Sequence, residues 1–256
     1  MKNFLKKNLR ILIIVAVVVA ATVGLLIYKS KLNSSSGASA DPLAYSVDFS
    51  QYDLLSVIEP SEANGYIGDH IKGDPSAPVT LFEYADFQCS GCAMMAPYVD
   101  QLLSEYEGKL RIIYRNYPIP SLHPNAIAAI SAAEAAGLQG YWEEYGSMLF
   151  ANQAEWFYST GTARTTLFMD YFRSLTNGAG DVAKFRSDMA SAEVKTKIKF
   201  DNAIATDAYK LDSTPTFIDE DGSVLDWYYK EKQTMSETYQ FFQDYVDAKL
   251  KEKGIE

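Results

Sequence analysis

The stretch that decides the fold is Val79-Thr80-Leu81-Phe82-Glu83-Tyr84-Ala85-Asp86-Phe87-Gln88-Cys89-Ser90-Gly91-Cys92. Its first nine residues form a β-rich apolar run, which predicts a buried strand. After the cysteines, apolar side chains recur at spacings of three and four up to Tyr106, which predicts a helix that ends at Gly108. A second strand is predicted over residues 110–114. The order is therefore strand, Cys-x-x-Cys turn, helix and strand, a βαβ unit with a redox pair at its turn.

The position of the two cysteines predicts their chemistry. Cys89 would lie at or just before the N-terminus of the helix, where free backbone N–H groups and the helix dipole favour an anion. A thiol in that position has a lowered pKa, and the thiolate is the species that attacks a disulfide. Cys92 lies one helical turn further on and is expected to be shielded. We therefore expect Cys89 to form the mixed disulfide with a substrate and Cys92 to resolve it.

Two other interpretations of the cysteine pair stay open. An inert structural disulfide is one, although a loop this short constrains the unfolded chain very little. A zinc site is the other, but it needs about four ligands. The chain has only two cysteines and two histidines, and His70 and His123 are not paired in spacing. We expect no metal and no other cofactor.

Composition excludes several classes of protein. The chain has 256 residues, of which 48% are hydrophobic and 22% charged, so it is too apolar to be intrinsically disordered. Its 33 acidic side chains outnumber 23 basic ones. This balance argues against a nucleic-acid partner, which requires a basic surface. Two cysteines are also too few for a scaffold held together by disulfides.

Basic charge is concentrated at the start of the chain, where residues 1–31 carry six bases and no acid. The apolar run over residues 11–27 would form about 26 Å of helix, close to the ~30 Å hydrocarbon core of a bilayer. We predict a cytoplasmic basic segment over residues 1–10 and a transmembrane signal-anchor helix over residues 11–28. The rest of a single-pass plasma-membrane protein would then lie on the extracytoplasmic side. A cleaved signal peptide is the alternative, with an Ala-x-Ala pattern at Ala38-Ser39-Ala40.

Helices are predicted between the second strand and residue 211. Periodic apolar residues and capping signals place them at 124–136, 141–152, 165–175, after Asp181, and at 192–211.

Beyond the helices, strand and turn signals return. Residues 216–219 predict a strand, residues 220–222 a hairpin turn, and residues 224–228 the partner strand. A last helix is predicted from about Ser236. Its apolar face is formed by Tyr239, Phe242, Val246 and Leu250.

The stretch from Ala77 to Cys92 resembles the active-site strand and helix of DsbA-like thiol:disulfide oxidoreductases of the thioredoxin superfamily. Pro97 matches the proline that kinks the first helix of that fold. Far downstream, Thr214-Pro215-Thr216-Phe217 resembles the family's cis-proline loop, and the cis form of an X–Pro bond is only ~0.5–1 kcal/mol less stable than trans. The resemblance covers roughly residues 73–250.

The resemblance implies an α/β fold class, a thioredoxin-like fold with an inserted all-helical domain, preceded by the transmembrane helix. The first part of the thioredoxin-like domain would span residues 73–120, the helical insertion 121–210 and the second part 211–253. Residues 29–72 would form a flexible stalk and a weakly ordered lead-in, because they are rich in Ser, Gly, Ala and Asp with scattered apolar positions.

The resemblance also implies roles for several residues. Thr214 and Pro215 would contact a substrate peptide, together with Ser90 and Gly91 between the cysteines. Glu83 lies six residues before Cys89, which is the spacing of a buried acid that moves protons in family members.

Strand alternation gives Glu83 the parity of Leu81 and Cys89, so it either faces the core or pairs with a base. Proton transfer and a structural role both stay open for this acid. We expect Asp86 to be a solvated residue at the strand end. We expect His123 to hold its own loop in place.

The function implied by the resemblance is that of a membrane-tethered oxidase, a monomer that donates its disulfide to reduced, unfolded exported proteins. The chain has no spare cysteine for its own reoxidation, which implies a membrane quinone-linked thiol oxidase as a partner. Gly91 stands where the best-known members have histidine, and Ser90 replaces the usual proline, so the strength of the oxidant stays open. An extracytoplasmic reductase or isomerase is the second hypothesis. A non-catalytic chaperone or peptide-binding module is the third.

Overall fold

The computed structural model of the chain describes residues 41–227 and 234–255. By its internal contacts, the chain divides into two units, Met1–Ala44 and Tyr45–Glu256. The transmembrane helix predicted over residues 11–28 lies outside the described residues. Within the described ranges, no helix combines the length and the apolarity that a membrane crossing requires.

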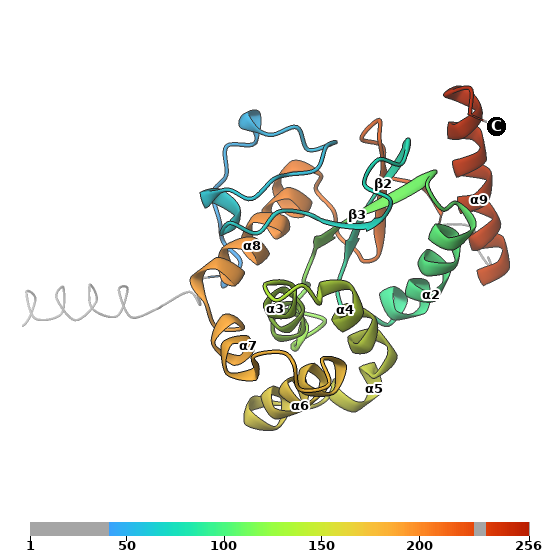
Figure 1. The fold of residues 1–256 in the computed structure, drawn as a ribbon. Helices are drawn as coiled ribbons and strands as arrows, with labels where there is room; N and C mark the ends of the chain where they lie inside the picture. Colours follow the sequence, from blue (N-terminus) through green and yellow to red (C-terminus); the bar gives the residue numbers. More distant parts are fainter. Residues whose placement is uncertain (1–40, 228–233, 256) are drawn as a thin grey trace, which may run out of the picture. The chain divides into compact units, whose positions relative to one another are not determined.

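The second unit is built on a four-stranded mixed sheet with the order β1-β3-β2-β4 (Figure 1). Its strands are β1 (His70–Gly73), β2 (Val79–Ala85), β3 (Leu110–Asn116) and β4 (Thr216–Asp219). Strands β2 and β3 are parallel and are joined by helix α2 (Ser90–Glu105), whereas β1 and β4 are antiparallel to their neighbours. The predicted βαβ unit, with the cysteine pair where the chain passes from β2 into α2, is confirmed.

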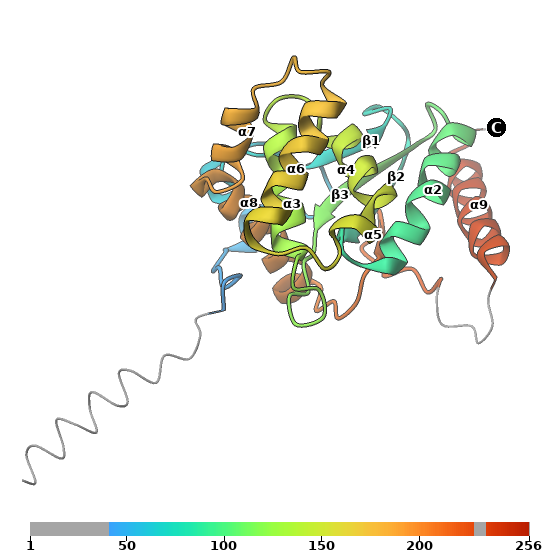
Figure 2. The ribbon, with the colours of Figure 1, turned by 90° about the horizontal axis from the view of Figure 1, so that it is seen from below.

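Helix α2 and helix α9 (Met235–Glu252) lie side by side on one face of the sheet, as both ribbon views show (Figures 1 and 2). Thr234 caps α9 by accepting a hydrogen bond from the Glu237 backbone N–H, and the Glu237 side chain bonds back to Thr234. The predicted apolar face of this last helix is buried except for Tyr239, which is partly buried. The core beneath the two helices contains Val79, Leu81, Val99, Leu102, Ile112, Phe217, Phe242, Val246 and Leu250.

The opposite face of the sheet is covered by α8 (Ala192–Ala203) and by the π-helical turn η3 (Ile204–Ala208) that continues it. Sheet and helix residues form a second core that includes Phe82, Tyr84, Ile113, Phe200, Ile204 and Ile218. The helix predicted over residues 192–211 is therefore present, but its last turn is widened. It packs on β3 and also contacts α3.

The remaining helices form a group beside the sheet in both views (Figures 1 and 2). They are α3 (Ala126–Gly137), α4 (Trp142–Ala151), α5 (Gln153–Trp156), α6 (Gly161–Leu175) and α7 (Val182–Asp188). Asp181 caps α7, as predicted, by accepting a hydrogen bond from the Lys184 N–H at 2.8 Å. Helix α4 contacts α2, and α3 contacts α8, so the group lies against both layers of the fold.

The lead-in to the domain is more ordered than predicted. It contains the short helical turns η1 (Phe49–Gln51) and η2 (Glu62–Asn64), and it ends in the edge strand β1. A buried ion pair anchors it, with 2.8 Å between Arg115 Nη2 and Asp69 Oδ2. Arg115 also donates to the carbonyls of Leu54 and Ser56. The prediction of a weakly ordered segment is wrong. Arg115, the residue that stabilises this segment, lies in β3, far along the chain, and local sequence patterns do not reveal such a contact.

The hairpin predicted after β4 is present only in part. The turn closes through a hydrogen bond of 3.0 Å from the Asp219 N–H to the Ser223 carbonyl. Ile218 and Val224 then form a single isolated bridge. Residues 225–227 form no strand, and residues 228–233 lie outside the described residues.

Candidate active site

The two cysteines lie at the start of α2, in unequal surroundings. Cys89 is the N-cap of this helix, and Cys92 lies in its first turn. Cys89 keeps 7% of its surface exposed, whereas Cys92 is completely buried. Both are free thiols. An external thiol or disulfide can therefore reach Cys89 but not Cys92.

The surroundings also separate the acidities of the two thiols. A hydrogen bond from the Cys92 thiol, assisted by the backbone N–H groups of Cys92 and Gly91, lowers the pKa of Cys89 to about 5, against the opposing effect of burial. Burial raises the pKa of Cys92 well above its ordinary value. At neutral pH, Cys89 is thus the thiolate and Cys92 the thiol, which is the state required of a nucleophile and a resolving partner.

The predicted cis-proline loop lies directly against Cys89. The Thr214–Pro215 peptide bond is cis. Cys89 Sγ lies 3.3 Å from the Thr214 carbonyl oxygen, to which it donates a hydrogen bond when it is protonated. A Cβ added to Gly91 would lie 3.3 Å from Pro215 Cδ and 3.5 Å from Cys89 Sγ, so the missing side chain gives the loop room to approach.

These residues open into one groove of about 700 Å³, which is lined by Cys89, Ser90, Gly91, Thr214 and Pro215 among others. Its walls are largely apolar. The apolar lining residues are Met94, Leu211, Val224, Leu225 and Trp227. Because 47% of Met94 and 52% of Val224 are exposed, apolar surface is available next to the nucleophile. The groove therefore suits an extended, partly apolar peptide.

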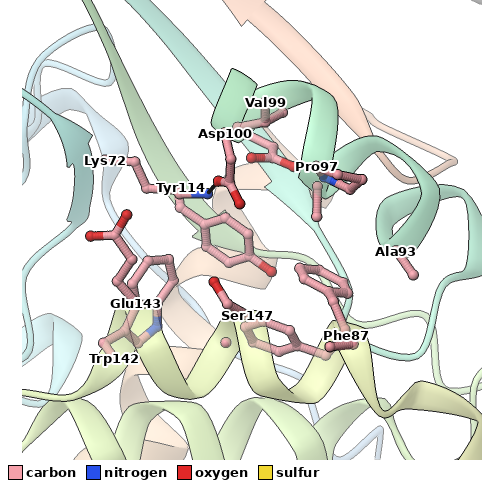
Figure 3. A pocket seen from close by; sticks show the side chains of 15 residues that line it. Lys72, Phe87, Ala93, Pro97, Val99, Asp100, Tyr114, Trp142, Glu143 and Ser147 are labelled. Carbon is pink, nitrogen blue, oxygen red and sulfur yellow. Dashed lines mark hydrogen bonds and ion pairs between the residues drawn. The ribbon is translucent and has the colours of Figure 1, made fainter. Parts of the chain in front are cut away.

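Glu83 lines a different pocket, of about 290 Å³, between α2, α4 and the sheet (Figure 3). Only 4% of its surface is exposed. Burial raises the pKa of Glu83 to about 7, although Lys72 acts in the opposite direction. Lys72 is itself ion-paired with Asp100 at the edge of the pocket (Figure 3). A carboxyl group that titrates near neutral pH can both take up and release a proton there.

Asp86 is completely buried, so the prediction of a solvated strand-end residue is wrong. Its carboxylate accepts hydrogen bonds from the N–H of Gln88 (2.8 Å), the N–H of Ile119 (3.3 Å) and Nδ1 of His123 (2.7 Å). The loop before α3 folds over the strand end, and no local pattern in β2 signals that cover. His123 holds this loop in place, in agreement with the prediction.

Two glutamines that were not predicted from the sequence support the active-site turn. Gln88 is buried and donates through Nε2 to the Phe157 carbonyl at 2.9 Å. Gln153 donates through Nε2 to the carbonyls of Phe87 (2.8 Å) and Cys89 (3.1 Å). Gln88 adjoins a cysteine, which could have drawn attention to it. Gln153 follows 64 residues after Cys89 and carries no signal in the sequence.

Glu83→Gln is expected to change how stability depends on pH. Because the folded-state pKa of about 7 exceeds the ordinary value of 4.5, the unfolded chain ionises first and the native state loses stability as pH rises from 4.5 through 7. The variant avoids this loss, so at pH 8 it should be more stable than the wild type by up to about 3 kcal/mol. The gain should shrink towards pH 4.

Urea unfolding at pH 4, 6 and 8 measures this difference. Glu143→Gln is the matched control, because Glu143 lines the same pocket but is exposed. Its stability should follow that of the wild type at all three values. Parallel pH profiles for Glu83→Gln and the wild type would contradict the raised pKa.

Comparison with known proteins identifies the family. Residues 66–247 match the family model described as Thioredoxin. The chain belongs to the thioredoxin family. Among curated relatives of this thioredoxin-family protein, a Na(+)/H(+) antiporter NhaA 1 from Mycolicibacterium gilvum is 32% identical over 64% of the chain and 24% of its own length. An antiporter of the same name from Salinispora arenicola is 33% identical over 64% of the chain and 22% of its own length. The chain thus spans only about a quarter of these relatives.

Solved structures share the fold of this thioredoxin-family protein at low sequence identity. BdbD from Bacillus subtilis has a TM-score of 0.56 and 16% identity, covering 77% of the chain and 98% of BdbD. Alpha-DsbA1 from Wolbachia pipientis has a TM-score of 0.52 and 20% identity, covering 70% and 89%. MdbA, a thiol-disulfide oxidoreductase from Corynebacterium diphtheriae, has a TM-score of 0.52 and 19% identity, covering 71% and 94%. The predicted thioredoxin-like fold is confirmed, with DsbA-like structural neighbours.

Proposed function

We propose that this thioredoxin-family protein is a thiol:disulfide oxidoreductase of the DsbA-like oxidase type, which donates the Cys89–Cys92 disulfide to reduced exported proteins. One observation carries the proposal. Cys89, the partly exposed thiol, has a pKa of about 5 and lies 3.3 Å from the carbonyl oxygen of Thr214 in the cis-proline loop. The general class of oxidoreductase is supported by structural neighbours that include MdbA.

The reaction proceeds in two exchanges. A client thiolate attacks Cys89 Sγ of the Cys89–Cys92 disulfide, the intramolecular S–S bond breaks, and a mixed disulfide forms while Cys92 leaves and takes up a proton. A second client thiolate then attacks the client sulfur of the mixed disulfide and expels Cys89 as a thiolate. The client gains one disulfide and loses two thiol protons, of which one ends on Cys92 and one in solution. The low pKa of Cys89 favours oxidation of the client, because a more acidic thiol is the better leaving group.

In this scheme, Glu83 is the acid that donates a proton to Cys92. Its charge raises the pKa of Cys92, so the two groups interact electrostatically. With its own pKa of about 7, Glu83 can deliver the proton that Cys92 needs on leaving and regain it from water.

The proposal also includes a location and partners. The basic and apolar pattern of residues 1–31 supports an anchor in the plasma membrane with the catalytic domain on the extracytoplasmic side. There, a membrane quinone-linked thiol oxidase would restore the disulfide, and the protein would act as a monomer.

Redox titration against glutathione, with alkylation of free thiols as the readout, tests the direction of exchange. An oxidase is expected to have a potential above about −180 mV, whereas a value near −270 mV would indicate a reductase. Titration of the thiolate absorbance should give an apparent pKa for Cys89 near 5. A disulfide that resists glutathione altogether would leave only a non-catalytic binding module.

A further inference from the structure

We propose that His123 is a positioning residue for the redox centre: it neutralises the buried Asp86 carboxylate beneath the active-site turn and thereby allows Cys89 to persist as a thiolate. This inference rests on the proposed function, because it concerns the thiolate on which disulfide exchange depends.

Asp86 is in contact with both cysteines through its backbone. Its N–H donates to Cys92 Sγ at 3.5 Å. Its carbonyl accepts a hydrogen bond of 3.0 Å from the Cys89 N–H. The side chain of Asp86 is completely buried, so solvent and salt screen its charge far less than they screen a surface charge. An uncompensated anion at this point would act on the sulfur atoms.

His123 provides the compensating charge. Its Nδ1 lies 2.7 Å from Asp86 Oδ2, and 17% of its side chain is exposed, so the imidazole can exchange protons with solvent. The hydrogen bond to Asp86 raises the pKa of His123, and the charge of Cys89 acts in the same direction. An imidazolium next to the carboxylate makes the pair neutral overall.

Without His123, neither the negative charge of Asp86 nor that of Cys89 would have this compensating cation. The N–H groups of Gln88 and Ile119 donate to the Asp86 carboxylate. A second negative charge on Cys89 would then be disfavoured, which means a higher pKa for that thiol.

Other titratable groups surround this arrangement but do not replace His123. Those that face it are Tyr114, Glu83 and Cys92 on the inner side, Tyr209, Lys210 and Asp212 across the groove, and Arg164 of α6, which donates to Asn125 in the His123 loop. Among the described residues, His123 is the one basic side chain bonded to Asp86.

A double-mutant cycle tests the inference. Asp86→Asn, His123→Gln and the double variant are compared with the wild type by thiolate absorbance and by redox equilibrium with glutathione. His123→Gln is expected to raise the apparent pKa of Cys89 by about one unit and to shift the glutathione equilibrium about tenfold towards the protein disulfide, or about 30 mV less oxidising. The double variant should return to within about threefold of the wild type, because it also lacks the anion.

A purely structural role for His123 predicts a different pattern. The double variant would then lie at least as far from the wild type as His123→Gln does, and that result would overturn the inference. So would an unchanged pKa of Cys89 in His123→Gln. His70→Gln is the matched control, because His70 also bonds to a buried carboxylate, Glu134, at 2.9 Å, but this pair joins β1 to α3 and does not contact the active-site turn. It should leave the titration of Cys89 unchanged.

A measurement on the wild type needs no substitution. The chain has two histidines, so both imidazoles can be followed by NMR. His123 should titrate at a higher pH in the reduced protein than in the oxidised protein, because the Cys89 thiolate favours the imidazolium. Identical titration of His123 in both forms would overturn the inference, whereas a Cys89 that titrates near its ordinary pKa would instead overturn the proposed function.

Discussion

Cys92→Ala is expected to accumulate a mixed disulfide between Cys89 and a client, whereas Cys89→Ala should lose disulfide exchange completely. The reason is the unequal exposure of the two thiols. Cys92 is completely buried and a client cannot reach it, while Cys89 opens to the groove beside the cis-proline. Cys89 forms the mixed disulfide by attacking a client disulfide. Without Cys92, the protein has no thiol of its own to attack Cys89 Sγ and release the reduced client, so this intermediate accumulates.

Non-reducing electrophoresis after incubation with a client that contains an accessible disulfide reports the adduct, and a thiol-specific fluorophore reports the rate of exchange. Ser104→Ala, an exposed change at the far end of the same helix, is the control and should behave as the wild type. An adduct that forms with Cys89→Ala but not with Cys92→Ala would reverse the two roles.

Arg115→Met should destabilise the domain by about 3–5 kcal/mol, because it leaves Asp69 as a buried charge without its main partner. Both side chains are completely buried, with 2.8 Å between Arg115 Nη2 and Asp69 Oδ2. Lys197 remains at 3.4 Å from the other oxygen of Asp69, a longer contact that compensates only in part. The carbonyls of Leu54 and Ser56 also lose their donor.

Urea unfolding of the wild type and of Arg115→Met measures this loss in the free energy of unfolding. Arg173→Met is the control: Arg173 pairs with Asp170, but both side chains are about half exposed, and a surface pair contributes at most about 1 kcal/mol. Equal losses for the two variants would contradict the anchoring role of Arg115. Hydrogen exchange should also show that the backbone around Leu54 and Ser56 opens first in Arg115→Met.

The part of the fold that could be predicted rests on local patterns. The apolar run of β2, the cysteine spacing and the periodic helix behind them all lie within about thirty residues, and Thr214-Pro215 is recognisable as a motif. The ion pair of Arg115 could not be predicted from local patterns, because its partner Asp69 is 46 residues away. A single charged residue in an apolar strand also has no periodic pattern that would indicate its partner. The ordered structure of the lead-in could therefore not be predicted from the sequence.

The residues of the candidate site also fall into those that local motifs predicted and those that depend on long-range contacts. Cys89, Thr214 and Pro215 were predicted from motifs, and they line one groove. Strand alternation could place Glu83 on one face of β2, but not reveal which helix covers it. The burial of Asp86 depends on Ile119 and His123, which lie more than thirty residues further along the chain. Contacts of that range leave no trace in the spacing of neighbouring residues.

The groove at Cys89 and the pocket at Glu83 have no lining residue in common. A bound polypeptide that covers the sulfur consequently leaves the carboxyl group's own opening uncovered. Tyr114, Trp142 and the exposed Glu143 line that second opening. In the proposed reaction, Glu83 can therefore regain its proton from bulk water while the polypeptide is still bound.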